Sequence, residues 1–309
     1  MKRYLVTGGA GFVASHLAER LAAEKDSEVV IVDNMLTGEE WKVPQLKNVI
    51  FVKADVNDYR DMSAIFSGGR FDMVFHYAAV VGVKRTLANP NLVLQDIEGI
   101  KNMLDLSKNT GVKRFYFSSS SEVYGESFEY PQHEESTPLN SRLPYAIVKN
   151  VGEAFARSYY QEFGLEYTIL RFFNTYGPKQ SEDFVVSKFV RAALKNEDII
   201  IYGDGSQSRT FCYIDDNIEA TMNSLSDPKS VNSVINIGND IEVSVDKLAD
   251  VIIKATGSKS KKVYVDPLKE GDMARRQPHI AKMKEVLGRD MTSLDEGIGK
   301  LLDFHKTKK

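Results

Sequence analysis

The sequence predicts an α/β fold in which helices cover both faces of a parallel sheet. Short apolar runs alternate along the chain with longer segments of helical periodicity, which is the order found in doubly wound sheets. Runs such as EVVIVDN at 28–34 are apolar without alternation, as expected of strands that are buried on both faces. The first apolar run ends at a glycine-rich turn, which is typical of the start of such a fold.

The composition excludes several classes of protein. A chain of 309 residues is long enough for one large domain or two interleaved ones. Its net charge of −3, with both signs interspersed, indicates no surface for nucleic acid or an anionic membrane. Cys212 is the only cysteine, so an intramolecular disulfide is excluded. Since no apolar run is long enough for a signal sequence or a membrane span, we expect a cytoplasmic protein.

The first forty residues predict one strand–helix–strand unit. RYLVT at 3–7 is the first strand, and EVVIVDN is the second. Between them, Phe12, Val13, Leu17 and Leu21 recur at helical spacing. The size of about 30 residues is that of one βαβ element.

The turn TGGAGFVA at 7–14 predicts a dinucleotide site. Gly8 allows a tight turn, Gly11 lets backbone amides approach a pyrophosphate, and Ala14 at the third position still permits close helix–strand packing. The helix that follows directs the positive end of its dipole at the phosphates. Asp33 ends the second strand, where an acid accepts hydrogen bonds from the ribose hydroxyls. Because Asp33 repels a 2′-phosphate and no arginine follows it in DNMLTGEE, NAD is favoured over NADP.

Further strands are expected at 48–55, 71–79, 113–120 and 167–174, with helical patterns at 89–111 and 144–164. Asp55 and Val56 end the third strand beside the expected adenine, and His76–Ala79 end the fourth beside the phosphates. The five histidines are scattered, so His76 is interpreted as a strand-end residue and no metal site is expected. The residues expected to contact NAD are Gly8, Gly11, Phe12, Val13, Asp33, Asn34, Asp55, Val56, Tyr77, Ala78, Ala79, Ser118, Tyr145 and Lys149.

A helix beginning near Pro144 carries the candidate catalytic pair, Tyr145 and Lys149. Positions i and i+4 share one face of a helix, and a lysine beside a tyrosine stabilises the phenolate and lowers its pKa. Such a tyrosine can exchange a proton with a substrate hydroxyl, and a serine hydroxyl bonded to the same oxygen can orient the substrate. The serines at 118–121 end a predicted strand and can supply that hydroxyl.

Together these motifs resemble the extended short-chain dehydrogenase/reductase family, in its branch of nucleotide-sugar epimerases, dehydratases and decarboxylases. The resemblance extends over essentially the whole chain, with Ala14 replacing the usual third glycine. It rests on TGGAGFVASH, DVND, HYAAVVGV, FSSSSEVYGE, PYAIVK, RFFNTYGP and IYGDGSQSRTFCYIDD. It implies a Rossmann-type NAD-binding domain, 1–172 plus 211–256, and a smaller discontinuous nucleotide-sugar-binding domain, 173–210 plus 257–309. SVINIGN is expected to return to the main sheet. It also implies a homodimer packed through helices near 92–110 and 145–163.

The resemblance assigns a role to each matching residue. Ser120 is the catalytic hydroxyl, Tyr145 the acid/base and Lys149 its partner on the nicotinamide ribose. The substrate contacts that it implies are Val81, Lys84, Ser120, Glu122, Arg142, Asn174, Val186, Tyr202, Arg209 and Arg276. Among these, Asn174 contacts the diphosphate or sugar, Tyr202 the nucleobase and Arg209 the diphosphate, to which its planar fork is suited. The structural alternatives are a turn cap for Asn174 and an ion pair with Asp215 or Asp216 for Arg209. Arg276 is preferred over Arg275 as the arginine that reaches the substrate.

The family shares a first step, oxidation of the sugar C4 hydroxyl by NAD to a transient 4-keto sugar, and its members differ in the next one. Glu122 resembles the acid of dehydratases and uronate decarboxylases, but Ser121 stands where a dehydratase usually has an aspartate. Glu122 also has a purely structural alternative, as an acceptor of backbone amides in its loop.

Other segments divide between the two remaining reactions. Arg142 and the segment 185–189 resemble decarboxylases, whereas the segment 78–90 resembles an epimerase substrate loop and Asn150 replaces the decarboxylase arginine. We therefore expect C4 epimerisation of a UDP-hexose or UDP-hexuronate. Decarboxylation of UDP-glucuronate is the alternative and 4,6-dehydration of an NDP-hexose comes third. UDP is favoured on its frequency in the family. A non-catalytic NAD sensor is disfavoured because the serine, tyrosine and lysine are all present.

Overall fold

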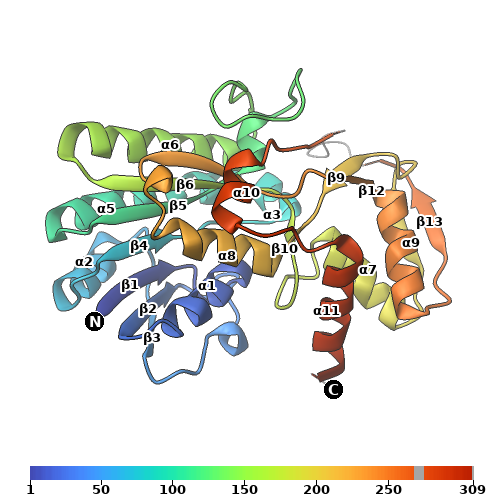
Figure 1. Cartoon of the computed structure of the whole chain (residues 1–309), viewed down its shortest axis with the longest axis horizontal. Coiled ribbons are helices and arrows are strands. Elements are labelled where there is room, and N and C mark those ends of the chain that lie inside the picture. Colours follow the sequence, from blue (N-terminus) through green and yellow to red (C-terminus); the bar gives the residue numbers. More distant parts are fainter. Residues whose placement is uncertain (268–274, 308–309) are drawn as a thin grey trace.

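The computed structural model describes residues 1–267 and 275–307 and contains a seven-stranded sheet between two layers of helices (Figure 1). The elements are β1 (Lys2–Thr7), α1 (Phe12–Ala22), β2 (Ser27–Asp33), η1 (Glu40–Lys42), β3 (Val49–Lys53), α2 (Tyr59–Gly68), β4 (Met73–His76), α3 (Val83–Ala88), α4 (Pro90–Leu94), α5 (Asp96–Thr110), β5 (Arg114–Ser120), η2 (Ser121–Tyr124), α6 (Pro144–Phe163), β6 (Glu166–Phe172), β7 (Thr175–Tyr176), α7 (Val185–Leu194), β8 (Ile199–Tyr202), β9 (Ser208–Thr210), β10 (Cys212–Tyr213), α8 (Ile214–Ser224), η3 (Pro228–Ser230), β11 (Ser233–Ile237), β12 (Glu242–Ser244), α9 (Val245–Thr256), β13 (Lys262–Val265), α10 (Ala281–Leu287) and α11 (Leu294–Thr307). Among the described residues, no helix is both long enough and apolar enough to cross a membrane.

The order of the main sheet is β3-β2-β1-β4-β5-β6-β11, and each neighbouring pair is parallel. This confirms the predicted doubly wound sheet, including the return of SVINIGN as β11 beside β6. The strand order reverses between β1 and β4. In sheets of this kind ligands bind in the crevice at the carboxyl ends of the strands that flank such a reversal.

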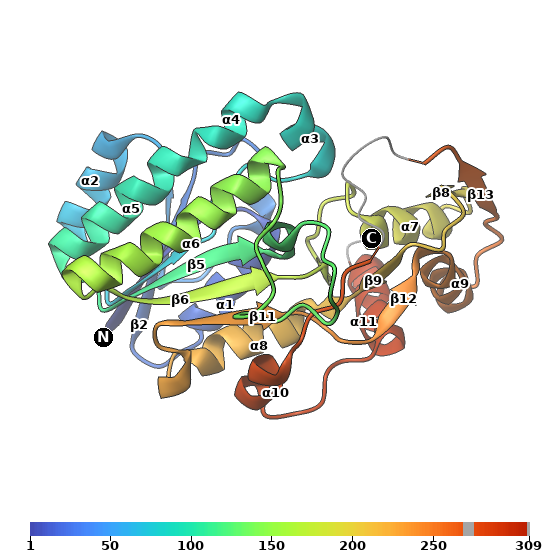
Figure 2. The same cartoon turned by 90° about the horizontal axis from the view of Figure 1, so that it is seen from above.

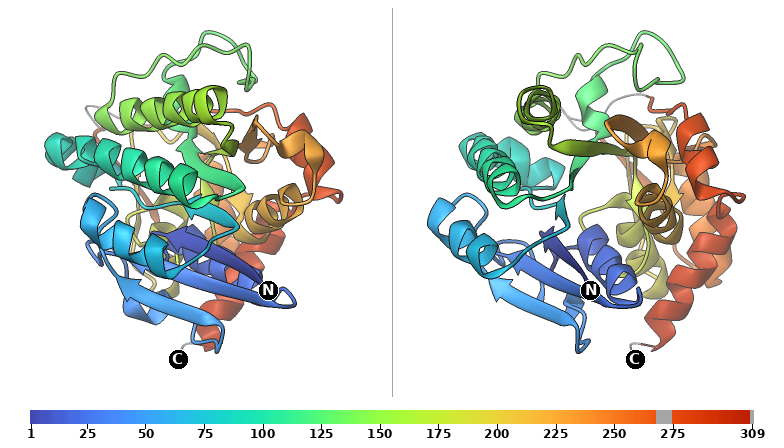
Figure 3. Two further views of the ribbon diagram at one scale, coloured as in Figure 1. Left: turned by 90° about the vertical axis from the view of Figure 1, so that its left-hand side faces the viewer. Right: turned by 60° about the vertical axis from the view of Figure 1, so that its left-hand side comes forward.

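Both faces of the sheet are buried, which explains the unbroken apolar runs. Helices α2, α5 and α6 cover one face, and α1 and α8 cover the other, with α10 packed on α8 (Figure 3). Successive residues of a strand point to opposite faces, so Tyr4 and Val6 belong to one apolar core and Leu5 to the other. Strands with two buried faces carry no polar alternation.

The helix ends follow local signals in the sequence. Pro144 occupies the first turn of α6, where its missing N–H leaves no bond unmade, and Gly164 ends the helix in the left-handed region. Asp58 caps α2 by accepting hydrogen bonds from two backbone N–H groups, and Ser244 caps α9 by accepting one from the Lys247 N–H. These residues therefore set the lengths of the helices.

A second group of elements lies beyond the carboxyl ends of the strands (Figure 2). It contains the parallel pair β8–β13, the antiparallel pair β9–β12, and the helices α7, α9 and α11. Helix α9 packs against both α7 and α11. The cavity described below is lined from both sides, by strand ends of the sheet and by residues at the start of α7.

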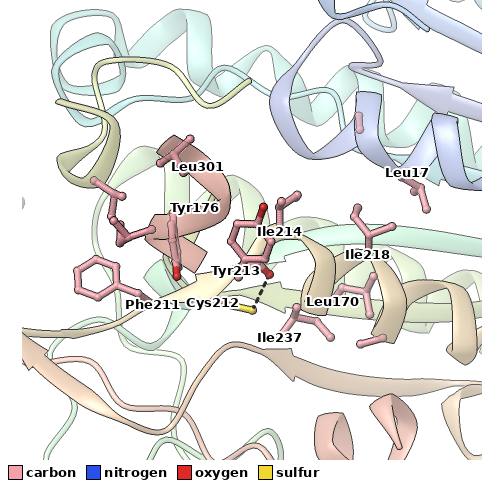
Figure 4. Close-up of a cluster of buried hydrophobic side chains, with 14 of the residues drawn as sticks. Leu17, Leu170, Tyr176, Phe211, Cys212, Tyr213, Ile214, Ile218, Ile237 and Leu301 are labelled. Carbon is pink, nitrogen blue, oxygen red and sulfur yellow. Dashed lines mark hydrogen bonds between the residues drawn. The ribbon is translucent and has the colours of Figure 1, made fainter. Parts of the chain in front are cut away.

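An apolar cluster joins this group to the sheet (Figure 4). Tyr176 and Tyr213 pack edge to face at 5.5 Å, and Leu301 of α11 belongs to the same cluster. Cys212 is fully buried within it, and its thiol donates to the Tyr213 carbonyl at 3.6 Å. Burial raises the pKa of the Cys212 thiol well above its ordinary value, so the thiol is protonated and unreactive at neutral pH.

A charged pair is buried between β6 and α6. Arg171 donates to the two carboxylate oxygens of Glu153 at 2.8 and 2.7 Å, and the exposed fractions of the two side chains are 2% and 0%. The carboxylate also accepts a hydrogen bond from the Ser119 hydroxyl at 2.6 Å, and Arg171 donates to the Tyr124 hydroxyl at 2.8 Å. The bidentate geometry and the additional bonds compensate the two charges for their loss of water.

Replacement of Arg171 by Met is expected to lower the free energy of unfolding by about 3–5 kcal/mol, because the Glu153 carboxylate then stays buried without its cation. The control is Arg157→Met. Arg157 contacts the same carboxylate at 3.4 Å, but its side chain is 44% exposed, so its loss is expected to cost about 0–1 kcal/mol. Urea unfolding followed by circular dichroism measures both. Equal costs for the two variants would contradict this assignment.

Candidate active site

A cavity of about 410 Å³ opens at the carboxyl ends of β1, β4 and β5, where the strand order reverses. Its volume lies in the range of small-molecule sites. All residues that the sequence predicts to contact NAD line this cavity, and so do Val81, Ser120, Glu122, Asn174, Val186 and Arg276 from the predicted substrate set. The roles of the individual residues stay predictions.

The turn between β1 and α1 forms one wall. Gly8 has φ of 70°, and a Cβ placed on it would lie 2.8 Å from the backbone nitrogen of Ala78 at the end of β4. Gly11 precedes α1, which begins without a side-chain cap. The first N–H groups of a helix have no partner within the helix, so this wall offers donors and a positive dipole end to an anion.

Asp33 lies at the end of β2 on the rim of this wall. Its carboxylate accepts hydrogen bonds from the backbone N–H groups of Ala10 at 3.0 Å and Met35 at 2.8 Å. Burial raises the pKa of the Asp33 carboxyl, and the two N–H groups act in the opposite direction. Asn34, which follows Asp33, donates a hydrogen bond at 3.1 Å to the carboxylate of Asp55, which lies just beyond the end of the neighbouring strand β3. The wall therefore ends in carboxylates, which suit ribose hydroxyls.

His76 has a structural position below the cavity. Its Nδ1 is hydrogen-bonded to the Thr7 hydroxyl at 2.9 Å, and that hydroxyl accepts from the backbone N–H groups of Tyr77 and Ala78. Burial and the nearby Lys149 lower the pKa of His76 to about 3, so it is uncharged at neutral pH. Within the described part of the chain, no group of three or more His, Cys, Asp or Glu residues could hold a metal ion.

The serine strand and α6 face each other across the cavity. Lys149 donates to the Ser118 hydroxyl at 3.4 Å, and its Nζ lies 5.7 Å from the centre of the Tyr145 ring. Ser120 accepts a hydrogen bond from the Glu122 backbone N–H at 3.2 Å, and its hydroxyl is within hydrogen-bonding reach of the Tyr145 phenol. Burial lowers the pKa of Lys149 to about 8, against the opposing effect of Asp96.

The pKa of Tyr145 differs in direction from the sequence prediction. Burial raises it, as does the negative charge of Glu122, while the Ser120 hydrogen bond and Arg276 act in the opposite direction. The prediction considered the neighbouring lysine but not the loss of water around the phenol, and here burial outweighs the favourable contacts. Tyr145 is therefore protonated at neutral pH in the structure of the chain alone.

Glu122 forms an ion pair with Arg276, which comes from a segment 154 residues away. The Arg276 Nη2 donates to the Glu122 carboxylate at 2.7 Å, and the side chains are 8% and 15% exposed. Glu122 Oε2 and Arg276 Nε are buried and have no hydrogen-bond partner among the described residues. Each charged group thus keeps one buried polar atom without a hydrogen-bond partner among the described residues, in a residue that lines the cavity. The sequence shows that EGDMARRQP is a charged segment, but it carries no signal that Arg276 contacts Glu122, the residue that follows the serines at 118–121.

Arg275, the neighbour of Arg276, points elsewhere. It donates to both carboxylate oxygens of Glu242 and lies over the ring of Tyr130 at 4.7 Å. Arg275 is exposed, whereas Arg276 lines the cavity. Asp272, which the sequence analysis noted beside both arginines, lies outside the described residues.

Four residues of the predicted substrate set are not among those that line the cavity. Arg209 on β9 is buried and donates to the Ser208 carbonyl at 2.7 Å. On β8, the ring of Tyr202 faces the ammonium group of Lys188, whose Nζ lies 5.2 Å from the ring centre. Arg142 is exposed before α6. Lys84 falls in α3, and its side chain lies outside what the structure describes.

Asp96, at the start of α5, lines the cavity and was missed by the sequence analysis. Its side chain is nearly buried, and its Oδ2 accepts a hydrogen bond from the Val80 backbone N–H at 2.8 Å. An acid in the first turn of a helix is common for reasons of dipole and capping. The pattern NPNLVLQD therefore carried no signal of a site.

Comparison with known proteins agrees with this fold and site. Residues 4–238 match the NAD dependent epimerase/dehydratase family, and the chain belongs to this family. The chain is 36% identical to the UDP-N-acetyl-alpha-D-glucosaminuronate decarboxylase of Bacillus cytotoxicus, over 92% of this chain and 91% of that protein. It is 35% identical to a putative UDP-glucose 4-epimerase of Methanocaldococcus jannaschii, over 98% of each.

Among solved structures, the UDP-glucose 4-epimerase of Thermotoga maritima with UDP-glucose superposes with a TM-score of 0.93 at 33% identity, over 99% of each chain. The protein is thus an NAD-dependent enzyme with the fold of the epimerases. The observed wall fits this cofactor, since the Gly8 turn, the uncapped start of α1 and the Asp33 carboxylate follow one another along the cavity.

Gly8→Ala is expected to weaken NAD binding at least about tenfold, because the new Cβ meets backbone atoms of Ala78 in addition to the strain of a positive φ. The control is Gly111→Ala. Gly111 also has a positive φ, of 78°, but a Cβ there meets nothing within 4 Å, so only the backbone strain of about 1–2 kcal/mol applies. Calorimetric titration with NAD and thermal unfolding separate the two effects. Wild-type NAD affinity in Gly8→Ala would contradict the assignment of the Gly8 turn to the NAD site.

Proposed function

We propose that the protein inverts the C4 centre of a nucleotide-diphosphate sugar, a UDP-hexose or UDP-hexuronate, through a transient 4-keto sugar. The observation that carries this choice is the Glu122–Arg276 ion pair beside Tyr145. Epimerisation needs one group that takes and returns a proton, and Tyr145 can be that group. Glu122 is bound to the Arg276 guanidinium at 2.7 Å, so this contact would have to break before the carboxylate could act as a second base.

The residues of the chain divide the work in this proposal. Tyr145 takes the proton of the C4 hydroxyl and returns it to the C4 oxygen on the opposite face of the sugar. Ser120 orients that oxygen by a hydrogen bond, and Lys149 supplies a positive charge near the phenol. NAD, when bound, supplies the oxidation of C4 and the reduction that follows. Taking the first proton requires the phenolate, so the positive charges of Lys149 and of the bound nicotinamide have to offset the burial that raises the pKa of Tyr145 in the chain alone.

Decarboxylation of UDP-glucuronate is the second candidate. Arg276 puts a cation into the cavity, where a sugar carboxylate could replace Glu122 as its partner, and the decarboxylase of Bacillus cytotoxicus is a relative at 36% identity. Against it, Asn150 stands in place of the arginine that decarboxylases usually carry after the catalytic lysine. Dehydration of an NDP-hexose comes third, since Ser121 stands in place of the aspartate that dehydratases usually carry.

We also propose that the enzyme is a cytoplasmic homodimer. The helices α5 and α6 carry the expected interface, and the surface around them exposes Leu94, Tyr160 and Phe163. Exposed apolar groups of this kind are typical of association surfaces. Light scattering at micromolar concentration tests the dimer. The division into an NAD-binding domain, 1–172 plus 211–256, and a nucleotide-sugar-binding domain, 173–210 plus 257–309, belongs to the same proposal.

The reaction is tested by incubating the purified enzyme and NAD with UDP-, dTDP-, GDP- and CDP-sugars. Product of unchanged mass with an inverted C4, seen by NMR, supports epimerisation. Loss of carbon dioxide would establish the decarboxylase and loss of water the dehydratase. Absence of reaction, with no cofactor reduction by any sugar nucleotide, would contradict an enzyme acting on these substrates. Tyr145→Phe is the control, since it keeps the ring but should lower the rate about 10²–10⁴-fold.

Glu122→Gln is expected to move the acid limb of the pH–rate profile to lower pH. The carboxylate raises the pKa of Tyr145, so its neutralisation lowers that pKa and the phenolate forms at lower pH. The same change leaves Arg276 without an anionic partner, so the affinity for a UDP-hexuronate should rise about tenfold relative to that for a UDP-hexose, which corresponds to about 1.4 kcal/mol.

Glu126→Gln is the matched control for this prediction, because Glu126 is an exposed acid a few residues further along the same loop. It should change neither the pH profile nor the ratio of affinities. If Glu122→Gln leaves both quantities at their wild-type values, Glu122 has a structural role only.

A further inference from the structure

Arg276 reaches the cavity from a segment that has no secondary structure of its own. Residues 275–279 belong to none of the helices and strands. Yet the Arg276 side chain is only 8% exposed, and its Nη2 holds the Glu122 carboxylate at 2.7 Å. Fixing a long arginine side chain in one place costs rotamer entropy, so the backbone of this segment has to be held by contacts from elsewhere in the chain.

The backbone of Gln132 supplies the first of these contacts. Gln132 lies in the loop between η2 and α6 and is fully buried. Its N–H donates to the Gln277 carbonyl at 2.7 Å, and its carbonyl accepts from the His279 N–H at 2.8 Å, which forms a short parallel bridge to Pro278. The chain directly after Arg276 is therefore bound on both sides of Pro278 to a second irregular segment.

The side chain of Asn236 fixes both irregular segments to the main sheet. Asn236 lies on β11 and is fully buried. Its Nδ2 donates to the carbonyls of Gln132 at 2.9 Å and of His279 at 3.2 Å, and its Oδ1 accepts from the Tyr124 hydroxyl at 2.7 Å. Tyr124 belongs to η2, the turn that carries Glu122. One amide thus uses both of its N–H groups and its oxygen to connect the segments of both partners of the ion pair.

The contacts on the other side of the segment are exposed to water. Arg275 is 45% exposed in its ion pair with Glu242, and the Tyr130 hydroxyl donates to the Arg275 carbonyl at an exposed position. Exposed ion pairs contribute little to stability. The carbonyls bound by Asn236 are different, because a buried carbonyl that loses its donor has no water to replace it. We therefore expect Asn236 to decide where Arg276 lies.

We propose that Asn236 is a positioning residue whose amide fixes Arg276 against Glu122 in the cavity, although Asn236 itself does not line it. The inference rests on the part that the ion pair has in the proposed function. The competing explanation is that Asn236 only stabilises the fold.

Asn236→Asp separates the two explanations. An ionised aspartate has nearly the same shape and still accepts from Tyr124, but it has no N–H to donate to the carbonyls of Gln132 and His279. Asn236→Ala is the second variant, in case a buried carboxylate prevents folding, since it removes the same two donors without adding a charge.

The first test locates Arg276 directly, in crystal structures of the wild-type protein and the variant with NAD bound. In Asn236→Asp the distance between the Arg276 guanidinium and the Glu122 carboxylate should exceed about 4 Å, the limit of an ion pair. If Arg276 keeps its contact with Glu122 in a folded Asn236 variant, the inference is overturned whatever the reaction is.

The second test is a double-mutant cycle between Asn236 and Arg276, read from the pH dependence of kcat/KM. Burial and Glu122 raise the pKa of Tyr145, and Arg276 lowers it. Arg276→Met should therefore move the acid limb of the profile to higher pH, and Asn236→Asp should move it in the same direction. Asn236→Asp should also lower kcat/KM about 10²-fold, the cost of a displacement of about 1 Å.

The cycle distinguishes an action through Arg276 from an independent one. In the Arg276→Met background, Asn236→Asp should lower kcat/KM by less than about twofold and leave the acid limb where Arg276→Met puts it. If the effects of the two substitutions multiply instead, Asn236 acts independently of Arg276 and the inference is overturned.

Asn48→Asp is the matched control. The Asn48 amide also donates to two backbone carbonyls, those of Ala22 at 2.8 Å and Ser27 at 3.1 Å, but it precedes β3, at the amino ends of the strands and away from the cavity. Its replacement should lower the temperature of unfolding and leave the pH profile unchanged. An equal movement of the acid limb in Asn48→Asp would make that movement a general effect of lost stability and would overturn the inference.

Failure of the proposed reaction is distinguishable from failure of this inference. If the wild-type enzyme turns over no sugar nucleotide but Arg276 leaves Glu122 in Asn236→Asp, the positioning stands and the proposed function fails. If the enzyme epimerises its substrate but Arg276 stays in place in the variant, the positioning fails and the proposed function stands.

Discussion

The buried ion pair of Arg171 and Glu153 is the constraint on which the geometry of the site depends. It joins β6 to α6 behind the strand end that carries Ser120, and Glu153 also accepts the Ser119 hydroxyl at 2.6 Å. Any movement of α6 along β5 would separate charges that have no water to replace their partner. The distance between the serine strand and Tyr145 on α6 is therefore held by a contact that itself lies outside the cavity.

The same network reaches the segment that carries Arg276. The Tyr124 hydroxyl donates to Asn236 at 2.7 Å, and the Asn236 amide donates to the carbonyl of His279 at 3.2 Å. Tyr124 ends the 3₁₀ turn that carries Glu122, and His279 lies three residues after Arg276. The segments that carry Glu122 and Arg276, the two partners of the ion pair in the cavity, are thus connected by one chain of hydrogen bonds. The position of the two charges in the cavity therefore depends on the same hydrogen-bond network that packs α6 against the sheet.

Much of the fold and of the cofactor wall could be predicted because their signals are local. A period of two or 3.6 residues, the Gly8 turn and Asp33 at a strand end each depend on a short stretch of sequence. The Glu122–Arg276 contact spans 154 positions and had no local signal. The direction of the Tyr145 pKa was missed for a related reason, since burial is decided by the packing of elements from the whole chain.

The environment of Cys212 has a practical consequence. The chain has one thiol, it is enclosed by the aromatic cluster around Tyr213, and its ionised form is strongly disfavoured. Maleimides and other thiol reagents attack the thiolate at accessible sites. A cysteine introduced on the surface would therefore be labelled alone, without first removing the native one. Fluorophores or spin labels placed on α6 and α9 could then report the distance between the sheet and the second group of elements while ligands bind.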